Sequence, residues 1–155
     1  MSNSMQNKIR VLLVDDETSA RRRLAQFLSD EADVEIIGEC KNGLEASTEI
    51  EHLAPDLVFL DVEMPERTGL EVVEHIGVER MPATIFATAY DHYALPAFDA
   101  NAIDYLLKPF DQARILKSMT TAQNWKRTGN LHEYRAQIPT EHTQMASAKK
   151  NQDQR

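Results

Sequence analysis

The sequence predicts an α/β fold, with a doubly wound, five-stranded parallel sheet in which a strand and a helix alternate five times. Five short runs of mostly apolar and β-branched residues suit strands buried on both faces of a sheet, and they lie at 9–14, 34–40, 57–60, 83–87 and 103–107. The segments between these runs carry apolar residues at helical spacing. Such alternation implies right-handed crossovers and helices on both faces of the sheet.

Two helices are predicted in the first third of the chain. Residues 18–29 form the first, because its apolar side chains fall on one stripe, made of Ala20, Leu24, Phe27 and Leu28. Arg21 to Arg23 lie mostly off that stripe, so we expect a solvated face rather than a contact with nucleic acid. The second helix follows Gly43 and ends before Pro55, with a stripe of Leu44, Ser47, Ile50 and Leu53.

Three further helices are predicted. The third covers about residues 70–76, after a loop that contains Pro65 and Gly69. The fourth covers 91–100, and Pro96 inside it implies that this helix begins late or is kinked. Asp111 can cap the fifth helix, whose inward stripe consists of Ile115, Leu116, Met119 and Ala122.

The composition excludes several classes of protein. The chain has 155 residues, 42% of them apolar, and a formal net charge of −8, which suits one globular domain. Cys40 is the single cysteine, so a disulfide scaffold is excluded, and we expect this side chain to pack as a small apolar residue. No apolar run approaches the roughly 18 residues that a membrane span needs. The first residues, MSNSMQNK, do not resemble a secretory signal, so we expect a cytoplasmic protein with no membrane partner.

Charge and patterning divide the chain into three parts. We predict a disordered N-terminus over 1–7, one folded domain over 8–126, and a polar, disordered tail or linker over 127–155, where apolar residues are isolated. Residues 1–126 carry 12 Lys and Arg against 22 Asp and Glu, a net charge of −10. We therefore expect no direct binding of nucleic acid.

Charged and polar side chains follow four of the predicted strands. Asp15 and Asp16 come after the first strand, Asp61 after the third, Thr88 ends the fourth, and Lys108 follows the fifth. These side chains should converge, because ligands of parallel α/β sheets bind outside the carboxyl ends of the strands. Close carboxylates raise one another's pKa, and a hard cation such as Mg²⁺ relieves their repulsion. The set predicts a magnesium-dependent phosphoryl site, in which Lys108 pairs with Asp61 or with a phosphate on it.

Four motifs in this order resemble the receiver domain of two-component response regulators. They are Val14-Asp15-Asp16-Glu17, Phe59-Leu60-Asp61-Val62-Glu63-Met64-Pro65, Ala87-Thr88-Ala89 and Tyr105-Leu106-Leu107-Lys108-Pro109-Phe110. The resemblance covers about residues 8–125 and implies a flavodoxin-like fold. The segment 88–110 is similar to receivers of the LytR/AlgR type, which are usually joined to a LytTR DNA-binding domain. Nothing after residue 126 resembles such a domain.

The resemblance implies which residues bind metal and phosphate. Asp61 would accept the phosphoryl group, and Mg²⁺ would be bound by Asp15, Asp16, Asp61 and the backbone carbonyl of Glu63. Lys108 would bind the phosphoryl oxygens, and the peptide bond that follows it would be cis.

The resemblance also implies a switch. Thr88 and the backbone amide of Ala89 would bind the phosphoryl group, and Thr88 and Tyr105 would change position together. Apart from the resemblance, we expect Glu63, two residues after the acceptor, to slow loss of the phosphoryl group, and Tyr90 to tune its lifetime as well.

A sensor histidine kinase or phosphotransfer protein is the partner that the resemblance implies. Phosphorylation would switch the face made of the helix at 91–100, the strand at 103–107 and the last helix, and so control dimerisation or target binding. The chain would catalyse only its own phosphorylation and slow dephosphorylation. Two alternatives stay open: a receiver fragment of a LytTR-type DNA-binding regulator, and a phosphate-independent scaffold. A phosphohydrolase would need an Asp-x-Asp pattern, and a nucleotide-binding domain would need glycines after the first strand; the sequence has neither.

Overall fold

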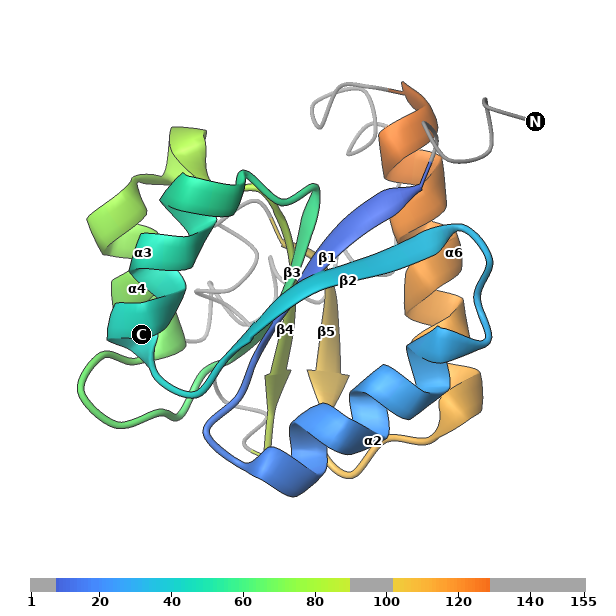
Figure 1. Ribbon diagram of the computed structural model, residues 1–155, viewed down its shortest axis with the longest axis horizontal. Coiled ribbons are helices and arrows are strands. Elements are labelled where there is room, and N and C mark those ends of the chain that lie inside the picture. The colour runs from blue at the N-terminus through green and yellow to red at the C-terminus, as the bar shows by residue number, and fades with distance from the viewer. Residues whose placement is uncertain (1–7, 90–101, 129–155) are drawn as a thin grey trace, which may run out of the picture.

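The computed structural model describes residues 8–89 and 102–128, and these form one five-stranded parallel sheet with helices packed on it (Figure 1). The strands are β1 (Ile9–Val14), β2 (Val34–Cys40), β3 (Leu57–Asp61), β4 (Ala83–Thr88) and β5 (Ala102–Leu107). The helices are α2 (Thr18–Ser29), α3 (Gly43–Leu53), α4 (Gly69–Ile76), the short 3₁₀ turn η1 (Val78–Arg80) and α6 (Gln112–Thr128). The strand order is β2-β1-β3-β4-β5, with every neighbouring pair parallel.

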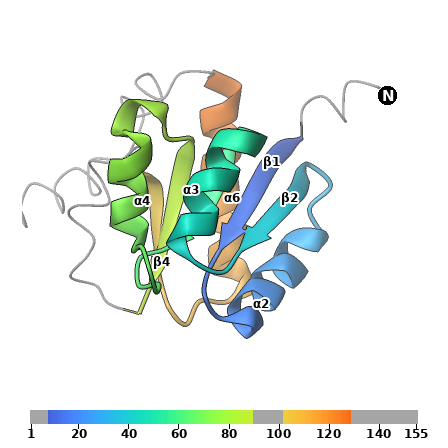
Figure 2. The same cartoon turned by 60° about the vertical axis from the view of Figure 1, so that its left-hand side comes forward.

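Helices cover both faces of the sheet, so the predicted doubly wound architecture is confirmed. Figures 1 and 2 show α2 and α6 on one side and α3 and α4 on the other. Each side has its own apolar core, because alternate residues of the central strands point to opposite faces. Leu12, Val14 and Leu60 pack toward α3 and α4, whereas Leu13 and Phe59 pack toward α2 and α6.

The predicted elements agree with the observed ones to within about two residues wherever the structure describes them. The first two strands and α2 have the predicted bounds, while α3 and α4 each begin one residue earlier, at a glycine. The last helix continues to Thr128, two residues beyond the predicted end of the domain. The helix predicted at 91–100, with Pro96, lies outside the described residues, as do 1–7 and the tail from 129 onward.

Polar side chains cap the helices. Asp111 accepts a hydrogen bond from the Arg114 amide at 2.9 Å, which confirms the predicted cap. Asn42 accepts one from the Glu45 amide at the start of α3. Thr68 and Glu71 exchange two bonds at the start of α4 in a capping box.

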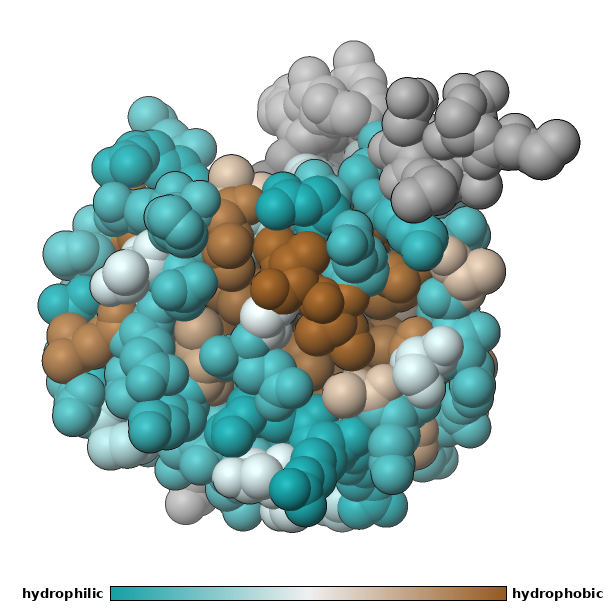
Figure 3. Space-filling model, in the orientation of Figure 1, coloured by the Kyte–Doolittle hydropathy of each residue, from teal (hydrophilic) through white to brown (hydrophobic). Residues whose placement is uncertain are grey.

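The edge strand β2 is only partly covered by helices. Most of its residues between Val34 and Gly38 are half-buried, and Figure 3 shows apolar side chains gathered where β2 crosses the front of the molecule. Glu35 and Glu39 are exposed on this strand, and charge along an edge opposes pairing with a strand of another chain. Cys40 is buried at the end of β2, as predicted, and burial raises the pKa of its thiol to about 12. Within the described part, no helix is both long and apolar enough to cross a bilayer.

An ion pair between the buried Asp104 and the partly exposed Arg114 ties β5 to α6, which the sequence did not predict. The Arg114 guanidinium donates two hydrogen bonds of 2.9 Å to the Asp104 carboxylate, and the Ser118 hydroxyl adds a third of 2.6 Å. Burial by itself would raise the pKa of Asp104. The hydrogen bonds from Arg114, Ser118 and the Tyr105 amide outweigh burial, so this pKa lies below its usual value.

Removal of the arginine should leave the buried Asp104 carboxylate without its positively charged partner. We expect Arg114→Met to lower the free energy of unfolding at pH 7 by about 3 kcal/mol. The deficit should shrink at lower pH, because loss of Arg114 leaves burial to raise the pKa of Asp104 and protonation then removes the unpaired charge. Urea unfolding at pH 5 and pH 7 measures both effects. Lys117→Met, at an exposed position of the same helix, serves as the control and should cost less than about 0.5 kcal/mol. An equal loss of stability at both pH values would contradict the role of Arg114 in stabilising the ionised Asp104 carboxylate.

Candidate functional site

Three carboxylates and one ammonium group meet at the carboxyl edge of the sheet. Asp15 and Asp16 follow β1, Asp61 ends β3, and Lys108 follows β5. One carboxylate oxygen from each of the three aspartates lies within 4.8 Å of the others. The chain runs outward in opposite directions from β1 and β3, which is the switch point where parallel α/β sheets bind ligands. The predicted convergence is confirmed for the three aspartates and Lys108.

Lys108 supplies positive charge to this cluster. Its Nζ lies 2.7 Å from an Asp15 oxygen, 3.5 Å from an Asp61 oxygen and 3.7 Å from a Glu17 oxygen. The predicted pairing with Asp61 is present, but the shorter contact is to Asp15. Burial would lower the pKa of Lys108, yet the surrounding carboxylates, led by the hydrogen bond to Asp15, raise it above its usual value.

Asp61 is the most deeply buried carboxylate of the cluster, with a side chain only 4% exposed. Burial raises its pKa to about 7, and the negative charge of Asp15 adds to this effect. Lys108 and the Glu63 amide, which lies 3.3 Å from Asp61 Oδ1, act in the opposite direction without restoring the usual pKa. The positive charge present therefore does not fully stabilise the ionised site.

The backbone holds both functional loops close to the sheet. The Asp15 amide donates to the Cys40 carbonyl, and Asp15 Oδ1 accepts from the Glu17 amide. At the other loop, a Cβ on Gly69 would lie 2.4 Å from the Asp61 carbonyl oxygen, so no other residue fits there without movement. The sequence marked Gly69 only as part of a loop; the close approach to Asp61 explains it.

The donor set fits a hard divalent cation. Mg²⁺ prefers oxygen ligands and commonly uses one or two carboxylates together with water and phosphate oxygens. Asp15, Asp16 and Asp61 offer such oxygens, and Asp16 is exposed, so the cluster is open to solvent on one side. In the described part of the chain, this is the one group of three or more Asp, Glu, His or Cys residues with the spacing of a metal site.

The comparisons with known proteins agree with this geometry. Residues 11–120 match the model of the response regulator receiver domain. The chain belongs to the response regulator receiver family.

Relatives and solved structures of receivers support the same assignment. The chain is 48% identical over 111 residues to the transcriptional regulatory protein BtsR of Escherichia coli, covering 72% of this chain and 46% of that protein. It is 47% identical over 108 residues to an uncharacterised response regulatory protein of Vibrio cholerae, covering 70% and 46%. It thus spans about half the length of these relatives. The response regulatory domain of mrkE from Klebsiella pneumoniae superposes with a TM-score of 0.70 at 29% identity, covering 77% of this chain and 99% of that one.

The remaining predicted positions of the receiver lie on β4 and β5. Thr88 is fully buried at the end of β4, and its carbonyl accepts a 2.7 Å hydrogen bond from the Lys108 amide. Ala89 follows it and is exposed. Tyr105 is half-buried and packs against the core on the α3 and α4 side. Tyr90 lies outside the described residues.

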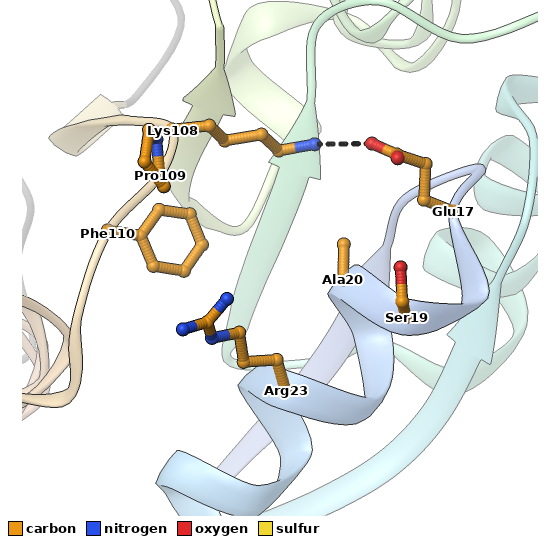
Figure 4. A pocket seen from close by; sticks show the side chains of 7 residues that line it. All are labelled: Glu17, Ser19, Ala20, Arg23, Lys108, Pro109 and Phe110. Atoms are coloured by element: carbon orange, nitrogen blue, oxygen red, sulfur yellow. Dashed lines mark ion pairs between the residues drawn. The ribbon is translucent and has the colours of Figure 1, made fainter.

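A hollow opens beside the acidic cluster of this receiver. Figure 4 shows it between Glu17 with the first turns of α2, which contribute Ala20 and Arg23, and the loop after β5, which contributes Lys108 to Phe110. The Lys108 side chain reaches across the hollow toward Glu17. The peptide bond between Lys108 and Pro109 is cis, as the resemblance implied.

One sequence prediction about α2 is wrong. We expected Arg21, Arg22 and Arg23 to be solvated together, and Arg22 and Arg23 are exposed. The Arg21 side chain is only 14% exposed, and its Nη1 donates a 2.6 Å hydrogen bond to the Asp15 carbonyl. Its position off the apolar stripe gave no sign of this contact, because the Asp15 carbonyl lies on the preceding loop and not on the helix.

The ionisation of Asp61 should destabilise the metal-free receiver as the pH rises. Its folded pKa of about 7 exceeds 3.8, the usual value of an aspartate. The stabilising contribution of Asp61 is therefore fully present below about pH 4 and is lost as the pH rises to about 7. Asp61→Asn avoids this loss. We expect the stability advantage of the variant to grow by about 2–4 kcal/mol between pH 4 and pH 8 in urea unfolding with EDTA. Asp30→Asn, at an exposed position, should show no such growth. A pH-independent advantage of Asp61→Asn would contradict the raised pKa.

Proposed function

We propose that the chain is a phosphorylation-driven switch in which Asp61 accepts a phosphoryl group from the phosphohistidine of a sensor kinase or phosphotransfer protein. The observation that carries this proposal is the meeting of Asp15, Asp16, Asp61 and Lys108 at one edge of the sheet. Membership of the receiver family supports it.

The residues of the site support an in-line transfer. An ionised oxygen of Asp61 attacks phosphorus, the bond from phosphorus to the histidine nitrogen breaks, and its electron pair returns to the imidazole. Lys108, within 3.5 Å of the acceptor carboxylate, pairs with the oxygens of the transferred group. Mg²⁺, held by Asp15, Asp16, Asp61 and the Glu63 carbonyl, supplies further positive charge to those oxygens when bound. The hollow beside Lys108 leaves this side of the site open to a donor.

The switch itself rests on β4 and β5. Thr88 and the Ala89 amide bind the phosphoryl group, and Tyr105 follows the movement of Thr88. This shift alters the face formed by β5, α6 and the helix predicted at 91–100, which then dimerises or binds a target. The phosphoryl group can bias this equilibrium only by the difference between its interactions with the two states.

A second proposal concerns the longer protein. Relatives whose receiver half matches this chain are described as transcriptional regulatory proteins, so we propose that this receiver serves a transcription regulator in the cytoplasm. The likeness of segment 88–110 to LytR/AlgR receivers would make the output domain a LytTR-type DNA-binding domain. The acidic receiver would then contribute no nucleic-acid contact of its own.

Phosphorylation of Asp61 can be tested directly by intact-mass spectrometry. Incubation with Mg²⁺ and acetyl phosphate should add one phosphoryl group to the chain. Asp61→Asn, which removes the nucleophile, and treatment with EDTA should each abolish the addition. Asp30→Asn should be phosphorylated like the wild type.

Rapid hydrolysis could hide the product, so a beryllofluoride titration followed by NMR completes the test. Saturable shifts of the Thr88 and Lys108 amides that need Asp61 would support the proposal. An absence of both added mass and beryllofluoride binding would favour the phosphate-independent scaffold.

Glu63 should slow the loss of the phosphoryl group. It is exposed two residues after the acceptor, where a carboxylate repels hydroxide and hinders an attacking water. We expect Glu63→Ala to accelerate dephosphorylation by about two- to fivefold, the range that an exposed charge interaction supports. Decay of the phosphorylated mass with time gives both rates, with Glu74→Ala on exposed α4 surface as the control. A wild type that decays faster than Glu63→Ala would contradict this role.

A further inference from the structure

The Arg21 side chain joins three parts of the molecule beside the acidic cluster. Its Nη1 donates to the Asp15 carbonyl at 2.6 Å, and its Nε donates to a Glu39 oxygen on β2 at 3.1 Å. Its Nη2 lies 3.3 Å from the Thr18 hydroxyl in the first turn of α2. One guanidinium group thus connects the β1–α2 loop, the helix that follows it and the neighbouring strand.

These bonds complete the fixation of Asp15. Its amide is already held by the Cys40 carbonyl, and its two side-chain oxygens accept from the Glu17 amide and from Lys108. The Asp15 carbonyl is the remaining polar group, and Arg21 holds it. Through Cys40 and Glu39, both backbone polar groups of Asp15 are therefore anchored to β2.

We propose that Arg21 is a positioning residue for the carboxylate loop that begins at Asp15. None of its three hydrogen bonds goes to the carboxylate of Asp15, Asp16 or Asp61. It fixes the peptide between Asp15 and Asp16, and so sets the direction from which both carboxylates approach the cation. This role rests on the proposed function, because it matters only if the loop binds a cation.

The geometry requires arginine rather than any cation. The three acceptors lie in different directions around the planar guanidinium, whose fixed fork of donors reaches all of them. A lysine ammonium is a compact point charge on a flexible stem, so it could satisfy one acceptor but not fix three. Arg22, the next residue, is exposed and offers a control with the same change of charge.

Electrostatics and positioning predict opposite results for removal of Arg21. Loss of a positive charge near a cation site should tighten cation binding, because repulsion falls. Loss of a positioning hydrogen bond should weaken it, and outer contacts of metal sites typically contribute roughly ten- to a hundredfold in affinity or activity. The direction of the change therefore separates the two explanations.

Isothermal titration of Mg²⁺ into the whole 155-residue chain tests the proposal. We expect Arg21→Gln to raise the Kd for Mg²⁺ roughly tenfold, and Arg21→Lys to recover only part of the loss. Arg22→Gln should stay within about twofold of wild type. An unchanged or lower Kd in Arg21→Gln would overturn the proposal.

Two further measurements separate positioning from folding and from failure of the proposed function. Glu39→Gln removes the ion pair to β2 but keeps the Arg21 bond to Asp15, so it should lower the urea midpoint while changing the Kd less than Arg21→Gln does. If Glu39→Gln weakened Mg²⁺ binding as much as Arg21→Gln, a general structural role would replace positioning. If the wild type bound no Mg²⁺ but Asp61 were still phosphorylated, the proposed role of Arg21 would be wrong and the proposed function would stand. If the wild type neither bound Mg²⁺ nor became phosphorylated, both proposals would be wrong.

Discussion

The balance of charge at the carboxyl edge of the sheet is the constraint on which the rest of the site depends. Three aspartates share one lysine, and Lys108 is 93 positions from Asp15 and 47 from Asp61 in the sequence. The parallel sheet, with β1 beside β3, brings these strand ends together at one edge. Burial keeps the pKa of Asp61 at about 7, so the ionised cluster stays costly until a further cation joins it. The same cost favours binding of a divalent ion.

Contacts from several elements keep this costly arrangement in place. On the β1 side, Arg21 and the Cys40 carbonyl fix Asp15 to β2. On the β3 side, Gly69 lets the chain pass against the Asp61 carbonyl. On the far side, Arg114 and Asp104 tie β5 to α6, close to the point where Lys108 leaves the strand. Each contact limits the freedom of charged groups that would otherwise move apart.

The sequence predicted the strands and the charged cluster well, because both depend on local patterns and on one topological rule. Apolar runs mark buried strands, and parallel strands end at one edge. Arg21 was misjudged because helical periodicity classifies a side chain only by its distance from the apolar stripe. Two of its three acceptors belong to Asp15 and Glu39, and no pattern within the helix encodes those two. The preference of Lys108 for Asp15 over Asp61 likewise depends on three-dimensional distances that spacing cannot supply.

The backbone also provides a route from the acceptor to the predicted switch residues. The Lys108 amide donates a hydrogen bond to the Thr88 carbonyl. Strands β4 and β5 are paired from Thr84 to Thr88, with Phe86 opposite Tyr105. In this state the Lys108 ammonium lies nearer to Asp15 than to Asp61. A phosphoryl group on Asp61 would add negative charge there and draw the ammonium away from Asp15. The Lys108 peptide is itself hydrogen-bonded to Thr88, so the charged site and the β4–β5 pair meet at this one residue.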